Sequence, residues 1–246
     1  MSGSDEAALL GPAALVLRQA YDMDVAKRSL EALALYREGI AILLDVMKPL
    51  AADSPKRQKL RTRVEEYMTR AEKLKKLIER DKSLGKFHQQ IRVANDSTGF
   101  GYARIFVPLV DEELTQVVVE DSYIRKHHQI LNFIRFCELL VKSAPSLKGI
   151  TLITGADESD KDGDLPGVAF KELKQSLAAK NIDLTVQFSS SLHDREIRFD
   201  NGWIVKIGRG LDYFKACPKY SIGSCDMDLR PCHETTIDIL HKQSSS

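Results

Sequence analysis

The spacing of apolar residues separates the chain into two regions of different structural class. Between about residues 7 and 84, apolar residues recur every three or four positions, which is the period of an amphipathic helix. Helices are expected over residues 7–22, residues 25–47 and a third segment that includes residues 61–80. Short links between successive helices favour an antiparallel three-helix bundle.

Beyond residue 99 the period changes, and short β-branched runs alternate with helical segments. The expected strands are residues 115–120, 149–154, 183–188, 195–199 and 203–207, and the expected helices are residues 123–142 and 168–179. Such alternation is typical of an α/β sheet whose faces are covered by helices.

The connecting segment, residues 85–99, loses the helical period and is rich in Gly, Asn, Asp and Ser. It is therefore predicted to be a linker. The whole prediction is a multi-domain chain, with an N-terminal all-α three-helix antiparallel bundle at residues 7–84 and a C-terminal α/β domain at residues 100–242.

The third helix has an apolar stripe that is wider than one contact in a bundle requires. Ala71 and Leu74 belong to its core face, and Met68 begins a second edge that lies between Glu65 and Glu72. A core helix with a broad buried face explains this pattern. A half-open apolar edge between carboxylates also explains it, and such an edge suits a partner helix.

Two motifs in the helical region resemble the MIT domain, the microtubule-interacting and trafficking bundle. They are Glu-Ala-Leu-x-Leu-Tyr at residues 31–36 and Tyr-Met-x-Arg-Ala-Glu-x-Leu-Lys at residues 67–75. The resemblance implies that the chain binds C-terminal helical tails of ESCRT-III subunits, commonly in the groove between the second and third helices. Carried onto this sequence, it implies a groove formed by Met68, Ala71 and Leu74, with Ile40 and Leu44 as the opposite wall and Glu65, Glu72 and Asp45 as acceptors for basic tail residues.

One constellation in the C-terminal region resembles the HKD signature of the phospholipase D superfamily. His193, Arg195 and Asp200 have its His-x-basic-(x)4-Asp spacing. In that superfamily the His attacks phosphorus and two motifs converge on one site. Here Arg replaces the usual Lys, the expected Gly-Ser does not follow, and a second copy is missing. We therefore expect a phospholipase D-like fold without catalytic residues, and the alternative is a phosphodiesterase that pairs two His193 side chains in a homodimer.

Basic and aromatic residues gather over the same part of the sequence. The cations are Arg195, Arg198, Lys206, Arg209, Lys215 and Lys219, and the aromatic residues are Trp203, Tyr213, Phe214 and Tyr220. This set predicts a surface for anionic phospholipids or phosphoinositides, to which each basic residue would contribute about 1 kcal/mol. A solvated basic face with Trp203 in the core is the alternative, because Asp194, Glu196 and Asp212 lie in the same span.

Composition narrows the choice of partners. The 246 residues have a net charge of +1, so no global field attracts nucleic acid, and we expect no nucleic-acid partner. The longest apolar runs fall short of the roughly 20 residues that a membrane span needs. The spacing of Cys225, Cys232 and His233 matches no zinc pattern, so we expect reduced thiols, no metal and no cofactor.

Together the two resemblances indicate a family of small proteins that join an MIT domain to a phospholipase D-like domain. The resemblance implies a non-enzymatic adaptor that supports abscission in cytokinesis and dimerises through its C-terminal domain. It also implies a cytoplasmic protein that attaches peripherally to the late endosomal membrane and the midbody. Two weak contacts on one chain would reinforce each other, because the second binding event is effectively intramolecular.

Overall fold

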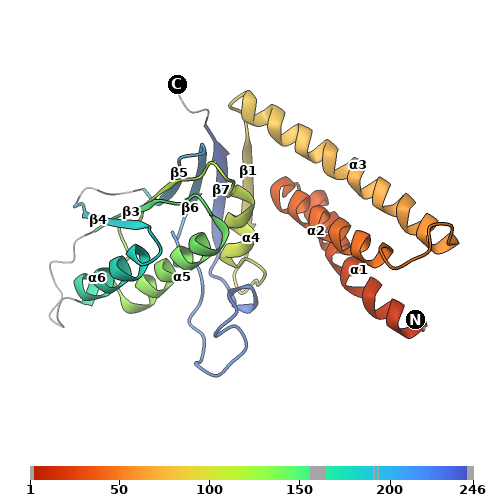
Figure 1. The fold of residues 1–246 in the computed structure, drawn as a ribbon. Coiled ribbons are helices and arrows are strands. Elements are labelled where there is room, and N and C mark those ends of the chain that lie inside the picture. Colours follow the sequence, from red (N-terminus) through yellow and green to blue (C-terminus); the bar gives the residue numbers. More distant parts are fainter. Residues whose placement is uncertain (1–2, 156–164, 191, 193, 243–246) are drawn as a thin grey trace. The chain divides into compact units, whose positions relative to one another are not determined.

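The chain divides after Gln89 into two compact units of different secondary structure (Figure 1). The computed structural model describes residues 3–155, 165–190, 192 and 194–242. The first unit is helical and the second is built on a mixed sheet. The predicted fold class, a helical bundle followed by an α/β domain, is confirmed.

The first unit consists of α1 (Gly3–Val25), α2 (Ser29–Met47) and α3 (Pro55–Ser83), and α2 packs on both other helices. Pro55 occupies the first helical position of α3, where its missing N–H has no intrahelical partner to lose. Gly39 allows α1 and α2 to approach closely, because a Cβ at this position would lie 2.6 Å from the Leu17 side chain. In the described part of the chain, no helix is both long and apolar enough to cross a membrane.

A carboxylate at the end of α1 joins all three helices. Asp24 accepts two hydrogen bonds of 2.6 Å from the Arg70 guanidinium of α3 and one of 3.3 Å from the Tyr36 hydroxyl of α2. The Tyr36 ring also lies 6.1 Å from the Tyr67 ring of α3. Burial and the negative charge of Asp24 raise the pKa of Tyr36 to about 12. These contacts turn the Arg70 side of α3 toward α1.

The second unit contains a sheet in which the described strands follow the order β1-β7-β6-β5-β2-β3-β4. Their bounds are β1 (His88–Val93), β2 (Gln116–Glu120), β3 (Gly149–Thr154), β4 (Asp183–Phe188), β5 (Glu196–Phe199), β6 (Trp203–Ile207) and β7 (Thr235–His241). Strands β2, β3 and β4 are parallel neighbours, whereas β5 is antiparallel to both β2 and β6, and β7 is antiparallel to β6. The sheet is therefore mixed, with parallel pairs from β2 to β4 and antiparallel pairs from β2 to β7.

The helices of the second unit lie on one face of this sheet. Helix α5 (His127–Ser143) connects β2 to β3, and α6 (Leu165–Ala178) connects β3 to β4. Both connections move to the next parallel strand in the same direction, and because such crossovers are right-handed, they place both helices on the same face. Figure 1 shows α5 and α6 side by side. The short α4 (Tyr102–Phe106) contacts α5, and 3₁₀ turns follow at Val107–Leu109 and Met227–Leu229.

Strand residues alternate between a buried face under these helices and a second, open face. Val117, Val119, Ile197, Phe199 and Val205 are buried. Among the described helices of the second unit, none lies over the other face. Side chains on that open face therefore keep access to solvent unless another molecule or another part of the chain covers them.

Two strands at one edge of the sheet were not predicted. Strand β1 occupies part of the predicted linker at residues 85–99, because Gln89, Ile91 and Val93 alternate with exposed residues and point into the protein. Strand β7 has the same signal in Ile237 and Ile239. The linker prediction is wrong over residues 88–93. The Gly, Asn, Asp and Ser residues on either side of this short strand dominate the composition of the segment, so the alternation of buried and exposed residues within it was not recognised.

Asp24→Asn tests the junction of the three helices. We expect the amides of α3 to lose about 1–2 kcal/mol of protection against hydrogen exchange in the full chain, because the charge-assisted bonds between Arg70 and the largely buried Asp24 carboxylate are lost. The matched control is Asp45→Asn, which removes the exposed pair between Asp45 and Lys48 and should cost about 0.5 kcal/mol or less. Equal effects of the two substitutions would contradict the role assigned to Asp24.

Candidate functional site

Two half-open apolar side chains lie on the same side of the helical unit. Met68 of α3 is 46% exposed and Leu44 of α2 is 44% exposed. A helix turns about 100° per residue, so Met68 is about 160° around α3 from Arg70, which faces α1. Leu44 is likewise about 140° around α2 from Gly39, which also faces α1. Both side chains therefore border the groove between α2 and α3.

The remaining apolar groove residues predicted from the sequence are buried. Ala71, Leu74 and Ile40 are 7%, 4% and 9% exposed, so they form the floor between the two helices. The Tyr36–Tyr67 contact shows that these two residues lie at the same height along the antiparallel helices α2 and α3. Counting 1.5 Å per residue from this contact, Met68 and Leu44 lie about 13 Å apart along the groove. An added helix of about nine residues would span both.

Carboxylates stand at the rim of this groove. Glu65 and Glu72, one turn to either side of Met68, are exposed, as is Asp45 beside Leu44. Glu65 accepts a 3.0 Å hydrogen bond from Arg61, and Asp45 pairs with Lys48 at 2.6 Å. Both pairs are exposed and are worth little, so a basic partner can exchange with their cations.

In the second unit, Arg195 makes its contacts inside the protein. Its Nε lies 3.7 Å from Asp121, its Nη1 donates a 3.0 Å hydrogen bond to the Gly208 carbonyl, and its guanidinium lies 4.0 Å from the Tyr123 ring centroid. Asp121 is only 3% exposed, and burial raises its pKa, although the Tyr123 backbone N–H and Arg195 oppose this. Gly210 (φ +60°) is required beside it, because a Cβ there would overlap Asp121 Oδ2.

Two members of the degenerate motif, Arg195 and Asp200, lie at opposite ends of one strand. Asp200 accepts hydrogen bonds from the backbone N–H and the hydroxyl of Thr115, at the opposite end of β5 from Arg195. Five residues of extended strand separate Arg195 and Asp200 by roughly 16 Å. His193 lies outside the described residues. Arg195 and Asp200 therefore make their contacts at opposite ends of β5.

Two of the predicted cations, Arg198 and Lys206, lie on the open sheet face and form ion pairs there. Arg198 pairs with Glu120 and, at 2.6 Å, with Glu196, and Lys206 pairs with Glu196 at 3.2 Å. Asp238 lies opposite Lys206 in the β6–β7 register. Arg198 and Lys206 thus both meet carboxylates, and this part of the predicted basic surface is neutralised.

The other predicted cations lie in the segment after β6. Arg209 and Lys219 are exposed, and Lys215 pairs with Asp96 at 2.7 Å. Lys219 lies 5.5 Å from the ring centroid of Tyr220. The six predicted cations therefore do not form one continuous surface.

Three of the four aromatic residues predicted as membrane anchors belong to the core. Trp203, Tyr213 and Phe214 are at most 5% exposed, so the alternative that placed Trp203 in the core is correct. Tyr220 is 92% exposed, and Ile222, which the sequence analysis missed, is 79% exposed. An apolar residue between Ser and Gly was the available signal for Ile222.

Comparison with known proteins assigns both units. Residues 10–76 match the family model of the MIT (microtubule interacting and transport) domain, and residues 99–241 match that of the phospholipase D-like domain at the C-terminus of MIT. MIT domain-containing protein 1 of Mus musculus is 46% identical over 232 residues, which make up 94% of this chain and 92% of the mouse protein. The chain belongs to this family. Both resemblances found in the sequence are confirmed.

The ion-pair network of the phospholipase D-like domain predicts a pH dependence. Burial acts to raise the pKa of Glu196, but hydrogen bonds from Lys206 and Arg198 outweigh it, so this pKa lies below its ordinary value of 4.5. The network therefore stabilises the fold fully above pH 4.5, and this contribution is lost as the pH falls through the lower folded-state pKa.

Lys206→Met should raise the pKa of Glu196, because burial remains after one of the two donors is lost. Titration of the Glu196 carboxyl by NMR measures this pKa. Arg209→Met is the control, since Arg209 is exposed and belongs to a different segment. A pKa of Glu196 that stays constant in Lys206→Met would show that Arg198 alone sets it.

Proposed function

We propose that this chain is a non-enzymatic adaptor whose MIT domain binds C-terminal helical tails of ESCRT-III subunits. The tail helix would lie in the groove between α2 and α3. The observation that supports this most directly is the 46% exposure of Met68, an apolar side chain between two exposed carboxylates. Apolar surface with a charged rim is typical of binding sites on soluble proteins.

The charges beside α3 favour one side of the helix for a basic tail. Leu77 is 42% exposed and lies about 20° around the helix from Arg70, on the side turned toward α1. Its charged neighbours one turn away are Lys73, Arg80 and Asp81, and Arg80 pairs with Asp81 at 3.0 Å. Lys73 leaves this position with net positive charge. A tail with basic residues would therefore be disfavoured at Leu77 and attracted at Met68, where Glu65 and Glu72 take these positions.

The size of the open surface predicts that a single tail binds weakly. Complete burial of a Met or Leu side chain is worth about 1.5–3 kcal/mol, so burying the exposed half of Met68 and Leu44 contributes about 1 kcal/mol each. Exposed ion pairs with the rim add a few tenths of a kcal/mol each. A second contact on the same chain is then needed for stable recruitment.

The phospholipase D-like domain is proposed to supply that second contact by binding an anionic membrane surface. Its exposed loop residues Lys219, Tyr220 and Ile222 combine positive charge with apolar side chains, as interfacial segments do. Homodimerisation through this domain would double both contacts. The family resemblance further suggests a cytoplasmic protein that acts in abscission during cytokinesis, attached peripherally to late endosomal membranes and the midbody.

A catalytic role for the phospholipase D-like domain has less support. Arg195 is occupied by Asp121 and Gly208, and Asp200 binds Thr115 at the far end of β5. The alternative, a dimeric phosphodiesterase, would depend on His193. His193→Ala should retain tail and vesicle binding, and turnover of a phosphodiester by the parent chain that this variant loses would favour the enzyme.

Met68→Asp tests the groove. We expect at least a tenfold loss of affinity for ESCRT-III C-terminal peptides. The Asp side chain would replace an apolar contact with the tail helix, and burying its charge under that helix is unfavourable. Fluorescence anisotropy of labelled peptides with the full chain measures the affinity. The domain should remain folded, since Met68 is nearly half exposed in the free protein.

Leu77→Asp is the matched control for this experiment. It introduces the same charge at a similarly exposed position of α3, and it should leave peptide affinity within about twofold. If Leu77→Asp abolished binding and Met68→Asp did not, the tail would lie on the α1 side of the helix. If neither variant changed the affinity, α3 would not be the binding surface.

A further inference from the structure

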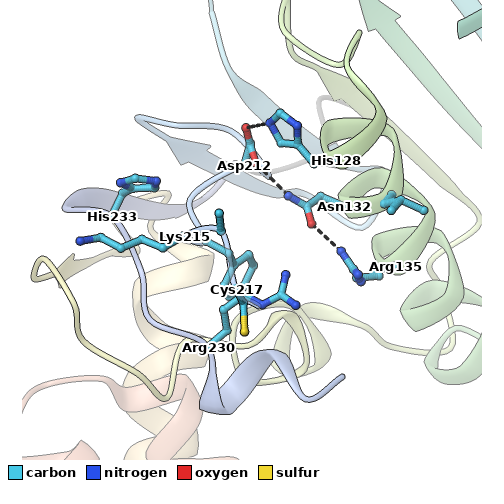
Figure 2. A pocket seen from close by; sticks show the side chains of 11 residues that line it. His128, Asn132, Arg135, Asp212, Lys215, Cys217, Arg230 and His233 are labelled. Atoms are coloured by element: carbon cyan, nitrogen blue, oxygen red, sulfur yellow. Dashed lines mark hydrogen bonds and ion pairs between the residues drawn. The ribbon is translucent and has the colours of Figure 1, made fainter. Parts of the chain in front are cut away.

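A cavity of about 440 Å³ opens in the phospholipase D-like domain, and neither Arg195 nor Asp200 lines it. Helix α5 forms one wall, and the segments around residues 212–217 and 230–233 form the others (Figure 2). The charged or titratable side chains that line it are His128, Arg135, Asp212, Lys215, Cys217, Arg230 and His233. A volume of this size suits a small polar ligand rather than a single water molecule.

The one carboxylate of this lining is occupied by neighbours on α5. Asp212 accepts hydrogen bonds from Asn132 at 2.9 Å and Gln129 at 3.3 Å, and it lies 3.2 Å from His128 Nε2. Asn132 is 4% exposed and in turn accepts a 2.9 Å hydrogen bond from Arg135 Nη1 (Figure 2). This chain of bonds holds the half-buried Arg135 guanidinium at the cavity wall without a direct pairing to Asp212.

Two guanidinium groups thus face the cavity without a carboxylate of their own. Within the described residues, Arg135 has its one hydrogen bond to the neutral amide of Asn132. Arg230 donates to the backbone carbonyls of Gly223 and Ser224, at 2.6 and 2.7 Å. Neutral acceptors orient these side chains but leave their positive charge uncompensated.

The pKa of His233, whose side chain lines the cavity, lies below its ordinary value. Burial lowers the pKa of His233, and the charges of Arg209 and Lys215 lower it further. Asp212 and Asp96 oppose this shift but do not reverse it. An anion bound between these groups would raise the pKa of His233.

We infer that this cavity binds a phosphomonoester group, with Arg135 and Arg230 as its main cationic partners. Lys215, which pairs with Asp96 at 2.7 Å, would be a third partner that exchanges this exposed carboxylate for the phosphate. Guanidinium forks match the oxygens of a phosphate, and a phosphomonoester carries nearly two negative charges near neutral pH. The inference rests on the proposed membrane contact and adds the site and the ligand chemistry that would make this contact selective.

The loop beside the cavity favours a lipid headgroup as the source of the phosphomonoester. The chain runs from Lys215 in the cavity wall through the exposed Tyr220 and Ile222 and returns to the wall at Arg230. The Arg230 guanidinium binds the carbonyls of Gly223 and Ser224 in this same loop. Arg230 would therefore hold a phosphate next to the loop whose apolar side chains, Tyr220 and Ile222, can enter the headgroup region.

Vesicle binding of the full chain tests the inference. Vesicles of phosphatidylcholine contain either phosphatidylserine or a phosphatidylinositol monophosphate, adjusted to equal total charge. We expect the unmodified chain to prefer the monophosphate vesicles about tenfold. Arg135→Gln should remove this preference without changing the binding of phosphatidylserine vesicles, and Lys215→Gln should reduce it independently.

Lys171→Gln is the charge-matched control. It removes one exposed cation from α6 of the same domain and should leave the preference intact. Ile222→Ser should weaken binding to both kinds of vesicle and leave binding of a soluble inositol monophosphate unchanged. NMR titration of the His233 ring with this soluble ligand reports directly on the cavity, and the pKa of His233 should rise in the unmodified chain but not in Arg135→Gln.

The outcomes separate this inference from the proposed function. Equal binding of both vesicle types, with no effect of Arg135→Gln and no response of His233 to the soluble ligand, would overturn the phosphomonoester site and leave general membrane binding standing. A response of His233 that depends on Arg135, without vesicle binding, would support the site, assign it to a soluble phosphomonoester and contradict the membrane contact.

Discussion

The bidentate hydrogen bond from Arg70 to Asp24 determines which side of α3 faces solvent in the groove between α2 and α3. If only apolar contacts held α3, the helix could rotate about its own axis by a few tens of degrees at small cost in free energy, because its apolar stripe is wider than its contact with the bundle. The charged pair removes this freedom because its geometry is directional. Met68 and Leu77, with 46% and 42% exposure, then lie on opposite sides of the same helix.

Carboxylates near Met68 and cations near Leu77 give these two apolar edges different partners. Neither edge is large, so recognition depends on the combination of a short apolar contact with a charge pattern. This arrangement favours a partner that presents a narrow stripe of apolar and basic residues at helical spacing, and it disfavours broad, permanent burial of the MIT domain surface. A groove of this kind is suited to reversible assembly.

Much of the fold could be predicted because its signals are local. Apolar spacing at helical period identified the three helices, and continuous apolar runs identified β3, β4 and β6 at their observed residues. What failed depended on partners far away in the sequence. The cations of β5 and β6 looked like a basic surface, but Glu120, 78 residues before Arg198, is brought beside them by the β2–β5 pairing.

The same reasoning explains why a fixed cavity matters for this chain. A net charge of +1 supplies almost no general attraction to an anionic surface, and the cations of the open sheet face are already paired. Positive charge remains available where neutral groups, namely the Asn132 amide and the Gly223 and Ser224 carbonyls, orient the guanidinium groups. Such charge acts over a short range and at a defined position, so it discriminates between ligands by the placement of their anionic groups. Selectivity in the phospholipase D-like domain therefore follows from which cations the fold leaves unpaired, rather than from how many cations the sequence contains.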